Sequence, residues 1–137
     1  MEIVVNICCA LLGAAGSYVV MQMQEKGRRM MQMNAELTDE VLRIENLMIR
    51  DFAAGEISDE LTAEIRRTGL RLEIFCNSRR FHFRKNRKLR SAWDAFVQQF
   101  AMAKPLKPYR GYEFVRVSTP ADFGLNIKID ALLKTLI

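Results

Sequence analysis

The feature that most limits the fold of this chain is an uncharged segment close to its N-terminus. Residues 3–21 (IVVNICCALLGAAGSYVVM) contain no Asp, Glu, Lys or Arg, and only Asn6, Ser17 and Tyr18 interrupt the apolar side chains. A helix rises about 1.5 Å per residue, so about 20 apolar residues match a hydrocarbon layer about 30 Å thick. The segment therefore predicts a single transmembrane helix, and we place this membrane anchor at residues 1–24.

Three other structures compete with a transmembrane helix. A secretory signal peptide begins with positive charge, whereas Glu2 is the only charged residue before the segment, and cleavage after Ala14-Ala15-Gly16 would leave an apolar N-terminus. A buried helix in a soluble core rarely continues so far without a charge. A helix lying flat on the bilayer has a charged face, which this segment lacks. The spanning helix fits the sequence best.

Charges on the two sides of the segment predict its orientation. Lys26, Arg28 and Arg29 follow it, whereas Glu2 precedes it. Positively charged flanks stay in the cytoplasm, so we expect an inner (cytoplasmic) membrane protein with the N-terminus outside and the C-terminal domain cytoplasmic. The cysteine content agrees with a cytoplasmic domain. The chain has three cysteines, two of them inside the apolar segment, so it lacks the disulfide framework typical of secreted domains.

Small residues share one face of the predicted anchor. Cys9, Gly13 and Ser17 are four residues apart, a spacing that lets two helix backbones approach closely in lipid. Asn6 can hydrogen-bond across such an interface. One interpretation is self-association into a homo-oligomer through these four residues; the other is the general abundance of small residues in spanning helices.

The rest of the chain, residues 25–137, has the size of one small basic domain. All 21 Lys and Arg residues and 15 of the 16 Asp and Glu residues lie there, so its net charge is +6. No repeat or Ser/Gly-rich linker divides it. Its apolar residues recur at spacings of three and four, which is typical of packed helices. We therefore expect a mainly all-α protein, in which a small cytosolic helical bundle follows the transmembrane helix.

Capping residues and apolar stripes predict the helices of this bundle. Thr38 and Ser58 are each expected to begin a helix, since both are good N-caps followed by two acidic residues. Gly55 is expected to end the first of these helices in the left-handed conformation. The residues predicted to face the core are Leu37, Val41, Ile44, Met48, Phe52, Leu61, Ile65, Leu72, Phe75, Trp93, Phe96, Val97, Phe100, Ile129, Leu132, Leu133 and Leu136.

The segment before the last helix has a different character. Pro105 and Pro108 interrupt the helical pattern, and residues 112–117 (YEFVRV) are rich in strand formers, so they are a candidate short strand. Thr119-Pro120 is typical of a helix start. Asp122-Phe123-Gly124 reproduces the kinase tripeptide without its partner motifs, and we interpret it as a turn before the last helix.

The densest positive charge lies in residues 79–90 (RRFHFRKNRKLR), where seven of twelve residues are Lys or Arg and two Phe and the only His are interleaved. Such a cluster attracts RNA or other polyanions, and its aromatic rings can stack on bases. Anionic lipid of the inner leaflet is a second candidate partner. A third interpretation is a solvated helix face whose arginines pair with neighbouring acidic residues. The candidate residues for binding an anionic partner are Arg79, Arg80, His82, Arg84, Lys85, Arg87, Lys88 and Arg90.

Catalytic chemistry finds little support in this sequence. It contains one histidine, no His/Cys cluster with metal-ligand spacing and no phosphate-binding loop. Cys76 and His82 are six residues apart and form the one weak candidate for a nucleophile and its base. We therefore predict no catalytic residue, no metal site and no cofactor.

The order of elements resembles that of membrane-anchored accessory proteins of bacterial antiviral systems, some of which oligomerise into pores and carry a HEPN-like bundle. A HEPN nuclease has an arginine separated from a histidine by four to six residues. The residues in that window before His82 are Phe75, Cys76 and Asn77, so the arginine is missing. The resemblance implies, as an alternative function, a HEPN-like RNA-directed ribonuclease or an RNA-responsive accessory protein.

The sequence favours a self-associating single-pass membrane protein whose basic cytosolic bundle binds an anionic partner, as a scaffold or a pore-type effector. A small subunit that docks on a larger membrane complex is a further alternative, since an aromatic helix face can serve as a docking surface. The expected partners are membrane lipid, further copies of the chain, RNA or another polyanion, and a larger membrane complex.

Overall fold

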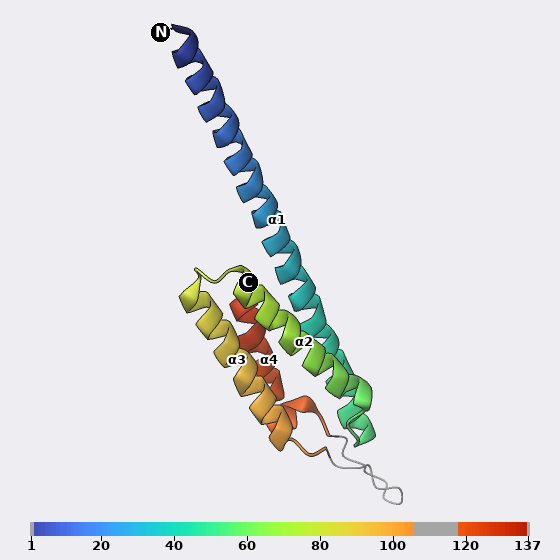
Figure 1. Cartoon of the computed structure of the whole chain (residues 1–137). Helices are drawn as coiled ribbons and strands as arrows, with labels where there is room; N and C mark the ends of the chain where they lie inside the picture. Colours follow the sequence, from blue (N-terminus) through green and yellow to red (C-terminus); the bar gives the residue numbers. More distant parts are fainter. Residues whose placement is uncertain (1, 106–117, 137) are drawn as a thin grey trace, which may run out of the picture. The chain divides into compact units, whose positions relative to one another are not determined.

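The computed structural model describes residues 2–105 and 118–136, and these are helical apart from short connections (Figure 1). The expected all-α fold is confirmed, and the candidate strand at 112–117 lies outside the described residues. The elements are α1 (Glu2–Ala54), α2 (Asp59–Ser78), α3 (Phe83–Met102), the 3-10 helix η1 (Pro120–Phe123) and α4 (Leu125–Leu136).

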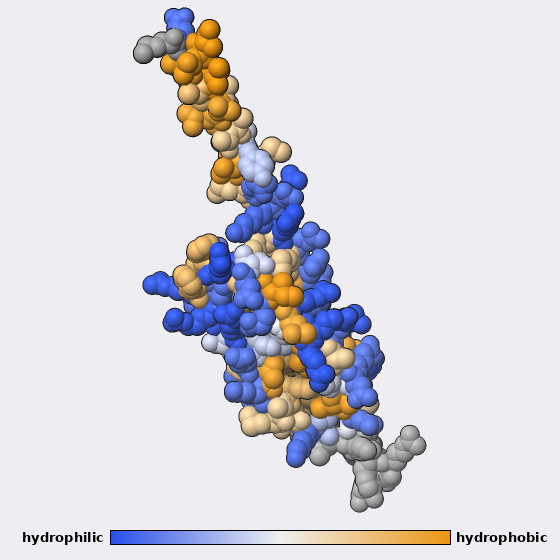
Figure 2. All heavy atoms as spheres, viewed as in Figure 1, coloured by the Kyte–Doolittle hydropathy of each residue, from blue (hydrophilic) through white to orange (hydrophobic). Residues whose placement is uncertain are grey.

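The chain divides into two compact units, Met1–Met33 and Asn34–Ile137, and α1 contributes to both. In the first unit, every described residue as far as Arg29 is exposed. Apolar side chains cover the beginning of α1 (Figure 2). By length and composition, this helix near the N-terminus is able to cross a membrane.

The second unit is an antiparallel bundle of the last part of α1 with α2, α3 and α4 (Figure 1). Arg50 pairs with Glu60 close to the α1–α2 connection, and Glu40 pairs with Arg71 further along both helices. Because α2 runs back along α1, the α2–α3 connection lies at the end of this unit that contains Asn34. The other end holds η1 and the α1–α2 connection.

The predicted apolar stripes form the core of the bundle. Burying a Leu, Ile or Phe side chain contributes about 1.5–3 kcal/mol, so the stripes provide most of the driving force for folding. The predicted residues that are buried are Leu37, Val41, Ile44, Met48, Phe52, Leu61, Ile65, Leu72, Phe75, Trp93, Phe96, Ile129, Leu132 and Leu136. The others, Val97, Phe100 and Leu133, are half-buried. Buried residues that the prediction missed include Leu47, Cys76, Leu89 and Leu125.

Two of the three capping predictions are confirmed. Ser58 caps α2, and its hydroxyl accepts a hydrogen bond from the Leu61 amide at 3.3 Å. Gly55 follows α1 with a φ of 76°. The prediction that Thr38 begins a helix is wrong, because α1 continues through it and its hydroxyl donates to the Asn34 carbonyl at 2.9 Å. A threonine inside a helix satisfies its hydroxyl in this way, so residue type alone does not mark a helix start.

The predicted turn before α4 is also present. Thr119 and Asp122 form a reciprocal capping box around η1, which begins at Pro120. Gly124 has a φ of 70° and separates η1 from α4. The ring of Phe123 packs edge-on against Phe52, with the ring centroids 5.5 Å apart, so η1 closes this end of the core.

Candidate anion-binding site at the α2–α3 connection

The basic run predicted from the sequence occupies the connection between α2 and α3 and the first part of α3. The bundle therefore gathers these cations at one of its ends. Their environments differ, and two of the eight predicted binding residues, Arg79 and Arg90, are held by neighbouring side chains.

Arg79 is fixed against the bundle. Its Nε donates a hydrogen bond to Oδ1 of Asn86 at 2.7 Å, and its guanidinium carbon lies 4.1 Å from the centroid of the Phe75 ring. Burial removes water from the guanidinium and lowers the pKa of Arg79. An arginine remains charged despite such a shift, so Arg79 is a structural cation of the connection.

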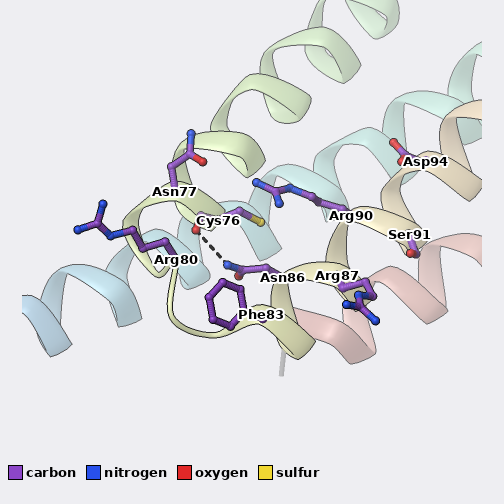
Figure 3. Close-up of a pocket in the computed structure, with 9 residues that line it drawn as sticks. All are labelled: Cys76, Asn77, Arg80, Phe83, Asn86, Arg87, Arg90, Ser91 and Asp94. Atoms are coloured by element: carbon purple, nitrogen blue, oxygen red, sulfur yellow. Dashed lines mark hydrogen bonds between the residues drawn. The ribbon is translucent and has the colours of Figure 1, made fainter.

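Asn86 holds the connection together, a role that was not predicted from the sequence. It is 5% exposed, and its Nδ2 donates to the carbonyl oxygen of Cys76 at 3.0 Å (Figure 3). The same Nδ2 donates to the carbonyl oxygen of Arg79, also at 3.0 Å. The last carbonyls of a helix have no partner within that helix, so this amide from α3 caps the end of α2. The only sequence signal for it is an amide placed among cations.

Arg90 pairs with Glu73 of α2. Its Nε and Nη2 donate to the two carboxylate oxygens, each at 3.2 Å. These hydrogen bonds raise the pKa of Arg90. The interpretation of the run as a helix face paired with acidic neighbours therefore holds for this residue.

Five other cations of the run are exposed and form no ion pair with any described residue. The first turn of α3 contains no acidic residue, so the positive end of the helix dipole adds to their field. His82, also exposed, directly precedes α3. The five are Arg80, Arg84, Lys85, Arg87 and Lys88.

Two large aromatic side chains lie among these cations. Phe81 is 73% and Phe83 71% exposed, although phenylalanine is usually buried. The guanidinium carbon of Arg80 lies 5.4 Å from the Phe81 ring centroid. Beside Phe83 is a cleft of about 440 Å³ whose lining includes three arginines and one aspartate (Figure 3). We call residues 80–88 with their exposed cations and two Phe rings the connection surface.

The weak candidate for a nucleophile and base lies next to this surface. Cys76 is buried, whereas His82 is exposed. Burial raises the pKa of the Cys76 thiol, and this effect outweighs the opposing charges of Arg90 and Arg79. The thiol is the less nucleophilic form of cysteine, so the arrangement does not activate Cys76. The described residues contain no group of three His, Cys, Asp or Glu side chains that could hold a metal ion.

The predicted association residues of the anchor lie together in the first unit. Asn6, Cys9, Gly13 and Ser17 are exposed on the helix, and a Cβ added to Gly13 meets no atom within 4 Å. Self-association stays a prediction.

Comparison with protein-family models, with curated proteins and with solved structures gives no match to this chain. The resemblance to accessory proteins of antiviral systems therefore rests on the order of elements alone. Function has to be inferred from the chain's own residues.

Proposed function

We propose that this protein is a single-pass membrane protein whose basic bundle binds an anionic partner at the cytoplasmic face of the membrane. The observation that carries the proposal is the connection surface, where residues 80–88 present five cations without an ion-pair partner among the described residues, and two exposed Phe rings. The same chain has an apolar helix able to cross a membrane. Anchor and binding surface together define a membrane-bound binding module.

The charges next to the apolar segment support the cytoplasmic placement of the bundle. Arg29 pairs with Glu25 one helical turn away, at 3.0 Å, and both side chains are exposed. Such a surface pair is weak, and Lys26 and Arg28 form no ion pair with any described residue. This flank therefore stays positive, which keeps it in the cytoplasm.

Self-association through the small-residue face of the anchor would turn the module into a scaffold. Several copies would present several connection surfaces on one side of the membrane. Binding through linked sites raises the apparent affinity by about 10²–10⁴-fold without any new contact. The anchor would thus both attach the protein to the membrane and cluster its copies.

Membrane attachment is tested with the full-length protein in washed cell membranes. We expect it to stay in the pellet after alkaline carbonate extraction. Protease should digest the bundle in inside-out vesicles and spare it in right-side-out ones. Release by carbonate, or digestion in right-side-out vesicles, would overturn the anchor or its orientation.

Anion binding is tested with the full-length protein in mild detergent on immobilised heparin. The variant Arg84→Gln/Arg87→Gln/Lys88→Gln should elute at lower salt than the wild type, because it removes three cations of the connection surface. The matched control is Arg66→Gln/Lys104→Gln/Lys128→Gln, which removes three cations elsewhere on the bundle. Equal elution of the two variants would show that only net charge matters.

A further inference from the structure

We infer that the connection surface docks on anionic lipid, namely the headgroups of the membrane in which the anchor lies. The inference rests on the proposed function and names the partner of that surface. Lipid phosphates attract lysine and arginine near the bilayer surface, and apolar rings enter the boundary between headgroups and acyl chains. The exposed rings of Phe81 and Phe83, together with cations that pair with no described acidic residue, offer both kinds of contact.

The path of the chain favours lipid as the partner. The connection surface lies at the end of the bundle that contains Asn34, as the antiparallel pairing of α1 and α2 requires. Only residues 25–33 separate that unit from the predicted anchor, and a helix of this length spans about 14 Å. Whatever the angle at this junction, so short a tether gives the headgroup layer a high effective concentration around the surface.

The contacts behind the surface favour a preformed docking site. Asn86 caps the end of α2, and Arg79 packs on Phe75 and bonds to Asn86. Arg90 holds α3 to Glu73 of α2. These contacts fix the backbone of the connection, so binding has little backbone freedom to remove. The side chains that keep the structure and those that remain for lipid are therefore different ones.

The test places a fluorescent reporter at each end of α3 in the full-length protein. Phe83→Trp puts an indole on the connection surface, and Met102→Trp puts one at a position with the same exposure, 70% against 71%. The two positions are about 29 Å apart along the helix. The native Trp93 is 8% exposed and gives a constant background in both variants.

Each variant is reconstituted in nanodiscs of phosphatidylcholine alone or mixed with phosphatidylserine, with and without brominated acyl chains. We expect the Phe83→Trp emission to shift to the blue and to be quenched by brominated lipid in the anionic nanodiscs. High salt should weaken both effects by screening. The Met102→Trp emission should change in neither lipid. In the Phe83→Trp background, Arg84→Gln/Arg87→Gln/Lys88→Gln should abolish the response, and Arg66→Gln/Lys104→Gln/Lys128→Gln should leave it.

Three outcomes would overturn lipid docking and are distinguishable from one another. Equal responses of the two reporters would indicate a general approach of the bundle to lipid. A Phe83→Trp response to single-stranded RNA in phosphatidylcholine nanodiscs, without one to phosphatidylserine, would assign the surface to nucleic acid and leave the proposed function in place. No response to either, together with unchanged heparin elution of the triple variant, would remove the proposed function as well.

Discussion

The two parts of α1 share one helical backbone and differ in what surrounds them. Seven residues of α1 are buried, and all of them lie between Leu37 and Phe52, on one stripe of the helix. Residues 3–21 contain no charge and none of them is buried. A helix that is apolar on one stripe packs against protein, whereas one that is apolar all round needs an apolar solvent.

Along this one helix the apolar side chains change from an all-round distribution to a single stripe. The side chains change in character along α1, while the helix itself continues from Glu2 to Ala54. The first charged residue after the apolar segment is Glu25, and the buried stripe begins at Leu37. Substitutions that are harmless in one part should therefore be damaging in the other.

The largest effect is expected from Phe52→Ala in the second part of α1. Phe52 is completely buried and packs on Phe123, and truncation of a buried Phe costs about 3–5 kcal/mol through lost burial and the cavity left behind. Ile49→Ala is the control, because Ile49 is exposed on the same helix and should change stability by less than about 0.5 kcal/mol.

Denaturation of the full-length protein in mild detergent, followed by circular dichroism, measures both values. Carbonate extraction should retain both variants in the membrane. A similar loss of stability from Phe52→Ala and Ile49→Ala would contradict the packing of one stripe of this part of α1 in the core and the exposure of its other side.

The second prediction places the same charge in each part of α1. Leu12→Arg puts an arginine near the centre of the apolar segment, where insertion becomes less favourable by about 2.5–3.5 kcal/mol. Leu42→Arg puts one on the exposed side of the bundle part, where it meets water. The fraction of each variant in carbonate-washed membranes is the measurement. We expect a decrease for Leu12→Arg alone, and full retention of both variants would argue against a spanning helix.

The third prediction concerns the amide that holds the α2–α3 connection. Asn86→Ala removes the side-chain donor to the Cys76 carbonyl and the acceptor of Arg79 Nε, whereas the Arg79 carbonyl keeps the His82 amide as a donor. The substitution should destabilise the bundle by about 1–3 kcal/mol. Asn77→Ala is the control, since Asn77 is exposed on α2. Hydrogen exchange should show faster exchange at the end of α2 in Asn86→Ala only. Unchanged exchange there would mean that the cap does not fix the connection.

The bundle was predictable from the sequence because its stripes repeat at helical spacing. Stripe residues such as Val41 and Leu72 lie where the periodicity predicts. The prediction of a helix start at Thr38 was wrong, because a cap residue begins a helix only where the preceding chain is not already helical. Residues 22–37 consist mostly of strong helix formers such as Gln, Met, Glu, Arg and Ala, and nothing among them ends α1.

The candidate site was predictable in its charge and not in its internal pairing. A density of cations can be counted along the chain, so residues 79–90 stand out. Which cation is neutralised depends on how two helices are aligned. Glu73 and Arg90 are 17 residues apart and meet only because α3 runs back along α2, and the caps made by Asn86 need the same alignment.

The fourth prediction uses a buried carboxylate near the α1–α2 connection. Burial of Asp51 disfavours its charge, but hydrogen bonds from the Ser58 hydroxyl and amide and from Arg50 outweigh this effect and lower the pKa of Asp51. A lowered pKa stabilises the folded state above the usual carboxyl pKa of about 4, and this stability is lost as the pH falls through the lowered value.

Asp51→Asn should therefore destabilise the protein near neutral pH by about 1–2 kcal/mol. The difference from the wild type should shrink as the pH falls below about 4. Denaturation across this pH range measures it, and Asp59→Asn, an exposed neighbour, is the control. A difference that does not depend on pH would show that the charge of Asp51 contributes nothing.

The smallest effect is expected at the small-residue face of the anchor. Gly13→Leu/Ser17→Leu places two large side chains where the proposed helix–helix contact needs close approach, and such contacts in lipid are worth less than about 2 kcal/mol each. Light scattering in mild detergent, corrected for bound detergent, should show a wild-type oligomer that shifts toward the monomer in this variant. Leu11→Ile/Leu12→Ile changes the same helix without adding volume and is the control. An oligomeric wild-type mass that the Gly13→Leu/Ser17→Leu variant leaves unchanged would remove this face from the association. Exposed apolar side chains of the bundle, such as Leu70 and Ile74, would then be the next candidates for the contact.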